Sequence, residues 1–183
     1  MRAHKDGLRL SSATRRIIAK ASKWVGFIET MDCLAVPKIP EGPEWTYEIK
    51  LDGFRVEAIK HKQHGKVTLY SRRGNILNVK FPYIATALKE LPDDTILDGE
   101  LVALDSKGRS VFNLLQNFRS AEAQIHYYTF DILALKGKDL TQLPLAERRL
   151  VLNKIAPVNP CEPVCRFAWS QRRPPRLCKK ART

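Results

Sequence analysis

The chain has 183 residues, of which 44% are hydrophobic, and it carries a net charge of +13. This length allows one domain with a real core, and the composition favours a globular fold over disorder. No apolar stretch approaches the ~20 residues that span a membrane, and no signal peptide is recognisable. Four cysteines are too few for a disulfide scaffold, which predicts an intracellular, reducing compartment.

The positive charge is concentrated at the two ends. Residues 1–26 hold seven Lys/Arg and one Asp, and residues 161–183 hold seven Lys/Arg and one Glu. Basic ends suit contact with a phosphate backbone, although solvated flanks explain the same charges equally well. We therefore expect a basic leader over 1–26 with a short amphipathic helix within 11–25, a globular domain over 27–156, and an irregular basic tail over 157–183.

The globular region begins with an apolar-polar alternation that predicts a strand over 47–51. Its core-facing side chains would be Tyr47, Ile49 and Leu51. Its opposite face would place Glu48, Lys50 and Asp52 in a polar pocket. Asp52-Gly53 is a strong turn signal before a second apolar run, so a hairpin is expected here. A lysine held in this way is a candidate nucleophile, although ordinary charges on a solvated hairpin give the same pattern.

The later elements alternate between strands and helices. Strands are predicted over 66–71, 95–104 and 126–135. A helix starts at Phe81-Pro82, with apolar residues at helical spacing in Ile84, Leu88 and Leu91. A second helix is predicted near 111–120, and a third starts at Pro144 and buries Leu145, Leu152 and Ile155. The pattern is that of an α+β domain with a largely antiparallel sheet.

Four short motifs follow one another along the chain. They are Lys50-Leu51-Asp52-Gly53-Phe54-Arg55, Ser71-Arg72-Arg73-Gly74, Asp98-Gly99-Glu100-Leu101-Val102 and Phe130-Asp131-Ile132-Leu133. Together they resemble the motifs of covalent nucleotidyltransferases, which comprise ATP-dependent DNA ligases, RNA ligases and mRNA capping enzymes. The flanking residues, including Pro144-Leu145-Ala146-Glu147-Arg148-Arg149, are most similar to the ligase domain of bacterial ligase D. The resemblance covers about residues 27–156.

The resemblance implies an α+β, antiparallel-sheet covalent nucleotidyltransferase domain of the ATP-grasp-like ligase adenylation type. Lys50 would attack the α-phosphate of ATP, and the resulting lysine–AMP would serve to seal nicks in DNA repair and recombination. The cofactors would be ATP and Mg²⁺ or Mn²⁺. The partners would be nicked duplex DNA, bound through its phosphate backbone, and other repair proteins, but no membrane. The compartment would be the bacterial cytoplasm, at the nucleoid.

The nucleotide-binding residues implied by the resemblance are Glu48, Asp52, Arg55, Arg72, Glu100 and Phe130. Glu48 would accept a hydrogen bond from the adenine amino group and favour ATP over GTP. Arg55 would contact the ribose or the nick phosphate, and Arg72 the 5′-phosphate of the nick or the AMP phosphate. Glu100 would bind the ribose or hold the metal ion, and Phe130 would stack on adenine. A strand-face charge at Glu48 and a core side chain at Phe130 are the plain alternatives.

The glycine between two carboxylates in Asp98-Gly99-Glu100 permits close backbone approach and suggests a ligand, with Asp98 as a structural residue. In the tail, Cys161-x-x-x-Cys165 with Cys178 has a spacing compatible with zinc. No histidine or fourth cysteine follows nearby, which disfavours a zinc site.

The sequence departs from the family pattern after Phe130. Family members carry a later Glu-Gly motif for the metal, a Lys-x-Lys motif for the α-phosphate and an OB-fold domain that clamps DNA, and none of these follows here. We therefore expect a truncated adenylation domain, incomplete at its C-terminal side, that binds ATP weakly and adenylates slowly or not at all. Ligation would then require another polypeptide to supply the missing parts.

Two other functions remain open at this point. An RNA ligase or capping enzyme shares the superfamily motifs, and a preference for RNA nicks or for GTP would favour it. A non-catalytic nucleic-acid-binding scaffold would retain the fold alone. DNA binding that survives Lys50→Ala, weakens with salt and needs the basic ends would indicate this second alternative.

Overall fold

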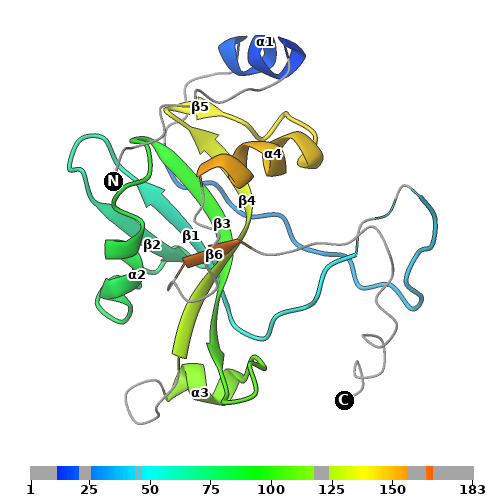
Figure 1. Cartoon of the computed structure of the whole chain (residues 1–183), viewed down its shortest axis with the longest axis vertical. Helices are drawn as coiled ribbons and strands as arrows, with labels where there is room; N and C mark the ends of the chain where they lie inside the picture. Colours follow the sequence, from blue (N-terminus) through cyan, green and yellow to red (C-terminus); the bar gives the residue numbers. More distant parts are fainter. Residues whose placement is uncertain are drawn as a thin grey trace.

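The sheet of this protein is a curled, largely antiparallel one with helices packed against it (Figure 1). The structure, a computed structural model, describes residues 12–20, 26–43, 45, 47–117, 124–155 and 164–166. The strands are β1 Phe54–Lys60, β2 Val67–Ser71, β3 Thr95–Leu104, β4 Gln124–Leu135, β5 Lys138–Asp139 and β6 Val164–Arg166. The helices are α1 Ser12–Lys20, α2 Pro82–Ala87, α3 Phe112–Gln116 and α4 Leu145–Ile155.

The strands follow the order β2-β1-β3-β4-β5 with antiparallel neighbours, and β6 pairs with β4 in parallel. This arrangement confirms the predicted α+β class with a largely antiparallel sheet. A two-residue turn joins β4 to β5, and its residues Lys136 and Gly137 have φ angles of 50° and 74°. Positive φ at both positions is the pattern of a type I′ hairpin turn, whose twist matches that of the strands.

One face of the sheet is apolar and is covered by helices. Val56 and Ala58 of β1, Leu97 of β3 and Tyr127 of β4 are fully buried there. Ile84 of α2, Leu115 of α3, and Val151 and Leu152 of α4 complete this core. In Figure 1, α2 lies beside β2, α4 beside β4 and β5, and α3 at the end where β3 leads into β4. The helices therefore seal one face and leave the other for polar side chains.

The opposite face carries a row of three carboxylates. Glu57 of β1 lies opposite Asp98 of β3, and Asp98 lies opposite Asp131 of β4, so the three side chains share a face. The segment that contains Ile28 crosses this face: the Ile28 N–H donates to Glu57 Oε1 at 3.1 Å, and its side chain packs on Ile59 and its neighbours. A chain segment rather than a helix thus covers part of the polar face.

Most of the predicted strands are confirmed. The prediction of 95–104 matches β3, and β2 and β4 differ from their predicted ranges by one and two residues at their first residues. The predicted strand over 47–51 is wrong, because residues 48–53 have no regular secondary structure and Ile49 is 49% exposed. The first hairpin instead joins β1 to β2 across residues 61–66.

The turn assigned to Asp52-Gly53 is also wrong, and the reason is visible in the packing. Gly53 does not have a positive φ. A Cβ atom at Gly53 would overlap the carbonyl oxygen of Leu101 and crowd Val102. The glycine therefore allows the chain to enter the sheet close against β3, rather than allowing it to reverse direction.

The helices are shorter than the sequence predicts. α2 ends at Ala87, although Leu88 and Leu91 are still buried. α3 ends at Gln116, and residues 118–120 of its predicted range lie outside the described residues. Leu145, expected in the core, is 40% exposed at the start of α4, whereas Leu152 is buried.

The leader and the tail are only partly described. α1 confirms a helix within 11–25, and Ile18 packs against the core, while residues 21–25 lie outside the description. The expectation of an irregular tail needs one correction, because β6 adds a parallel strand beside Tyr127–Thr129 of β4. The two stretches on either side of it, 156–163 and 167–183, and most of residues 1–26 are not described. Among the helices that are described, none combines the length and apolarity needed to cross a bilayer.

Candidate nucleotide-binding site

A cavity of about 870 Å³ opens where the segment before β1 meets the loop after β2 and the strands β3 and β4. Six residues singled out in the sequence line it, namely Glu48, Lys50, Arg55, Arg72, Glu100 and Phe130. The seventh, Asp52, is exposed and is not part of the lining. The four sequence motifs therefore converge on one cavity although 74 residues lie between the end of the first motif and the start of the last.

Lys50 lies on the irregular segment that leads into β1, and its side chain is exposed at the cavity. Within the part of the chain that is described, its amine forms no hydrogen bond or ion pair. Its positive charge nevertheless acts on a side chain inside the cavity, because it opposes the rise that burial causes in the pKa of Glu100. The amine is therefore available to a ligand.

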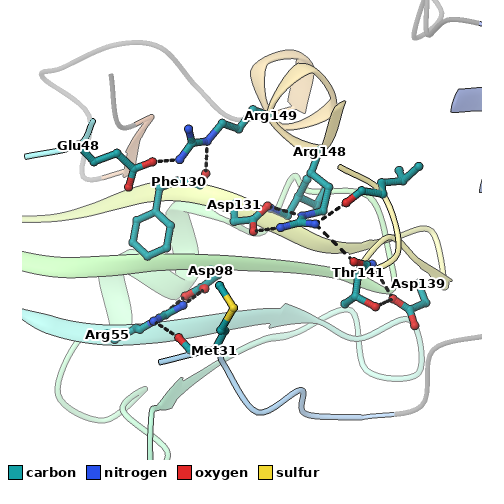
Figure 2. A network of polar contacts seen from close by, with 12 residues as sticks. Met31, Glu48, Arg55, Asp98, Phe130, Asp131, Asp139, Thr141, Arg148 and Arg149 are labelled. Atoms are coloured by element: carbon teal, nitrogen blue, oxygen red, sulfur yellow. Dashed lines mark hydrogen bonds and ion pairs between the residues drawn. The ribbon is translucent and has the colours of Figure 1, made fainter. Parts of the chain in front are cut away.

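Arg55 is held rigidly by Asp98. Its Nε and Nη2 donate to the two carboxylate oxygens at 3.1 and 2.6 Å, and its Nη1 donates to the Met31 carbonyl at 2.8 Å (Figure 2). Burial raises the pKa of Asp98 while Arg55 pulls it down, and the same hydrogen bonds raise the pKa of Arg55. Two short, parallel bonds are the geometry of an ionised pair.

Phe130 reaches the cavity because of a β-bulge. Gly99 pairs with Thr129 and Asp98 with Asp131, so Phe130 is an extra residue in β4 with no partner in β3. Bulges redirect side chains and are frequent beside functional sites. The ring faces Arg55, whose guanidinium carbon lies 5.6 Å from the ring centroid. The ring and the guanidinium thus form adjacent walls of the cavity.

Glu48 is anchored from a distant helix. Its Oε1 forms an ion pair with Nη2 of Arg149 on α4, whose Nε also donates to the Phe130 carbonyl at 3.4 Å (Figure 2). The neighbouring Arg148 turns instead to Asp131, with hydrogen bonds of 2.8 and 2.7 Å to its two oxygens. One pair of adjacent arginines therefore ties α4 both to the sheet and to the segment before Lys50.

Arg72 is exposed on the loop after β2 and pairs with Asp32. Asp32 follows Met31, whose carbonyl binds Arg55. One short segment thus contacts both cavity arginines that the sequence assigns to phosphate or ribose. Its next residue, Cys33, lines the cavity as an exposed free thiol.

Glu100 lies opposite Arg55 in the β1–β3 ladder. Burial raises its pKa to about 7, with Asp98 and Asp52 adding to the rise and Arg55 and Lys50 opposing it. Among the described residues no three acidic, His or Cys side chains converge as a metal cage. Mg²⁺ is commonly held by one or two carboxylates together with substrate phosphates, and Glu100 fits that pattern.

Gly99 does not serve a ligand, contrary to the sequence interpretation. A Cβ there would overlap the Tyr128 carbonyl and the ring of Tyr127. Tyr127 is fully buried, and its hydroxyl donates toward the Val56 and Leu97 carbonyls at 2.9 and 3.2 Å. The glycine makes room for this core side chain under the site.

Sequence reasoning missed two residues of this site, Asp32 and Arg149. Asp32 lies in a segment without regular structure, so no periodicity marks it. Arg149 was seen only as flanking sequence. The signal in the sequence is that Arg149 lies among apolar residues of a predicted helix. That position indicates burial, and a buried arginine needs partners.

An antiparallel sheet with helices on one face, and a cavity that joins a lysine to an aromatic ring and acidic and basic groups, defines a nucleotidyltransferase-type ligase domain. Solved structures of this class match it. The mycobacterial DNA ligase D complexed with ATP and MES is 29% identical with a TM-score of 0.57, over 68% of this chain and 40% of that one. The ligase domain of LigD from M. tuberculosis is 30% identical with a TM-score of 0.56, over the same shares.

The chain belongs to the ATP-dependent DNA ligase domain family, whose model matches residues 19–168. The multifunctional non-homologous end joining DNA repair protein LigD of Mycobacterium tuberculosis is 34% identical over 114 residues, 62% of this chain. The Pseudomonas aeruginosa protein LigD is 39% identical over 123 residues, 66% of this chain. The matches span only 15% and 14% of these two relatives.

Proposed function

We propose that this chain provides the nucleotide-binding part of an ATP-dependent DNA ligase, in which Lys50 accepts AMP before a nick is sealed in DNA repair or recombination. The observation that carries the proposal is the convergence of Lys50 with five other motif residues on one cavity. Membership of the ligase domain family and the repair function in the relatives' names support it. The bacterial origin of these relatives supports the further proposal of a bacterial cytoplasmic setting.

The central step is a group transfer to nitrogen. The Lys50 Nζ attacks the α-phosphorus of ATP, an N–P bond forms, the bond to the bridging oxygen of pyrophosphate breaks, and the amine releases a proton to solvent. The amine has to be neutral, whereas an ordinary lysine is charged at pH 7. Nearby carboxylates oppose neutrality, and the ion pair of Glu48 with Arg149 offsets one of them.

The remaining residues bind and orient the nucleotide. Phe130 supplies an aromatic face for the base, and Glu48 a carboxylate that accepts from its amino group. Arg55 and Arg72 supply cationic donors for ribose and phosphate oxygens. Glu100 would hold a divalent ion that, when bound, neutralises charge on the phosphates.

The test is incubation of the 183-residue chain with α-³²P-ATP and Mg²⁺ or Mn²⁺, followed by a denaturing gel. Lys50→Ala removes the nucleophile, and Lys80→Ala is the matched control, because Lys80 lines the same cavity. Label on the parent and on Lys80→Ala, but not on Lys50→Ala, would support the proposal. A folded parent that never becomes labelled would contradict lysine adenylation by this chain.

The leader supports a separable contribution to DNA binding. Arg15 and Arg16 of α1 are exposed, within a region that carries seven basic residues and one acidic residue. Such a surface would bind the phosphate backbone without sequence preference. Nick binding that weakens steeply with salt, and equally in Lys50→Ala and the parent, would support this contribution. Binding that is insensitive to salt would contradict it.

A further inference from the structure

Arg149 is a buried cation to which the reaction outlined above gives no contact with the nucleotide. It lies in the middle of α4 and is 5% exposed, yet its partner Glu48 lies on an irregular segment with a side chain that is 36% exposed. Burial lowers the pKa of Arg149, which reflects the cost of removing a guanidinium from water. A cation kept in such a place needs a compensating role.

A purely structural role is already filled by its neighbour. Arg148 forms two hydrogen bonds to Asp131, and its Nη1 donates to the Leu143 carbonyl at 2.6 Å. These contacts fasten α4 to β4 without touching the cavity. Arg149 instead contacts two cavity residues, the carboxylate of Glu48 and the main-chain carbonyl of Phe130.

The two contacts of Arg149 described above are made to the residues to which the proposed function assigns the base. Figure 2 shows the guanidinium of Arg149 between the Glu48 carboxylate and the main chain at Phe130, while the Phe130 ring extends from β4 toward Arg55. The ion pair uses Oε1 of Glu48 and leaves Oε2 outside it. Arg149 of α4 therefore binds both the Glu48 carboxylate and the main chain of the residue that carries the aromatic ring.

We propose that Arg149 is a positioning residue that sets base specificity by holding the Glu48 carboxylate where it reads the 6-position of a purine. The inference rests on the proposed function. A carboxylate only accepts hydrogen bonds, so it pairs with the 6-amino group of adenine and repels the 6-oxygen of hypoxanthine or guanine. Orientation matters because a carboxylate free to rotate turns away from an unfavourable oxygen and discriminates poorly.

The experiment measures equilibrium binding, so that it does not depend on turnover. ATP and ITP differ at one edge of the base, where ITP has a 6-oxygen in place of the 6-amino group and a hydrogen on N1, and the ratio of their dissociation constants reports on the recognition of that edge. We expect Arg149→Lys, which keeps the charge but loses the planar fork, to reduce the preference for ATP from about tenfold to twofold or less. Binding of tripolyphosphate, which has no base, should stay unchanged.

Arg148→Lys is the matched control, because it alters the adjacent arginine and its contacts with Asp131. It should lower the melting temperature and leave the ATP-to-ITP ratio unchanged. Glu48→Gln and the double variant that combines it with Arg149→Lys complete a double-mutant cycle. If Arg149 acts through Glu48, Arg149→Lys no longer changes the ATP-to-ITP ratio in the Glu48→Gln background. Melting curves of each variant establish that it is folded before binding is compared.

The outcomes separate the two proposals. A folded Arg149→Lys variant that keeps the parent's preference for ATP would overturn the positioning role and leave the proposed function intact. Effects of Arg149→Lys and Glu48→Gln that add independently would also overturn it. A folded parent that binds ATP no better than ITP would overturn this inference. A folded parent that binds neither nucleotide would overturn both this inference and the proposed function.

Discussion

Arg55 and Asp98 lie diagonally across β1 and β3, joined by two hydrogen bonds of 3.1 and 2.6 Å, and the Asp98 side chain is only 3% exposed. The pair holds a cavity arginine in one orientation. The pair also makes the two charges depend on each other. If either residue lost its charge, the other would remain as an unpaired buried charge, which is costly.

Asp98→Asn is therefore expected to lower the free energy of unfolding by about 2–4 kcal/mol, since Arg55 would be left without its counter-charge. Urea unfolding monitored by tryptophan fluorescence measures the change. Glu90→Gln makes the same chemical substitution in an exposed ion pair with Lys89 and should leave stability unchanged. Equal effects of the two substitutions would contradict the importance of the buried pair.

Glu57 predicts a pH dependence of stability. It is 2% exposed, its Oε2 has no hydrogen-bond partner among the described residues, and burial raises its pKa to about 7 from the usual 4.5. Between these two pH values the folded protein holds a proton that the unfolded chain has released. Stability therefore falls as pH rises from about 4.5 to 7, and the loss is complete above pH 7.

Glu57→Gln should flatten this dependence and stabilise the protein at pH 8 by about 1–2 kcal/mol, because no buried charge has to form. Urea midpoints measured from pH 5 to pH 8 test this. Glu100, whose pKa is also raised to about 7, contributes a decline in the same direction, so a residual slope is expected in the variant. An unaltered slope would contradict the role of Glu57.

If Arg72 binds a phosphate, as the proposed function has it, its partner Asp32 competes with that phosphate. The two side chains are paired in the absence of a ligand, and each is 60% exposed. Asp32→Asn should free the guanidinium and tighten ATP binding by about two- to fivefold at low salt, because an exposed pair contributes less than about 1 kcal/mol. Titration calorimetry at low and high salt measures this gain. It should disappear at high salt, and tighter binding at both salt concentrations would contradict the competition.

Gly99→Ala should be strongly destabilising, because the new methyl group meets the Tyr128 main chain and the ring of Tyr127. We expect a loss of about 2–3 kcal/mol in unfolding free energy. Gly108→Ala is the control: its φ is +70°, but no atom lies within 4 Å of its Cβ position, so only the backbone strain of about 1 kcal/mol remains. Thermal unfolding ranks the two, and the reverse order would contradict steric crowding at Gly99.

The sequence was sufficient for the strands β2, β3 and β4 and for six of the seven candidate residues of the cavity. Long apolar runs such as β3 are governed by local patterning, and the motif residues could be located by resemblance. What failed depended on contacts between distant segments. The conformation of the segment around Ile49 is determined by how the chain packs against β3, and not by the alternation of apolar and polar residues within the segment. Arg149 acquires its partner only after α4 packs beside β4.

The bulge at Phe130 was beyond sequence reasoning for a related reason. Ladder register depends on how two strands align, and neither strand records the offset in its own composition. The second register shift, between Ile96 and Leu97, is of the same kind and leaves Leu133 without a partner in β3, although its carbonyl accepts a hydrogen bond from the Leu140 N–H.

The extra residue at Phe130 makes the count of residues in β4 as important as their identity. In an uninterrupted ladder, Asp98 would lie opposite Phe130, and Asp131 would lie opposite Leu97 on the apolar face. An in-frame loss of one codon between Gln124 and Phe130 would keep the motif residues but remove the extra residue, so that Asp131 stays opposite Asp98 while Phe130 comes to lie opposite Gly99. Because Gly99 lies on the apolar face beside Tyr127, the Phe130 ring would then turn toward the core and away from the cavity.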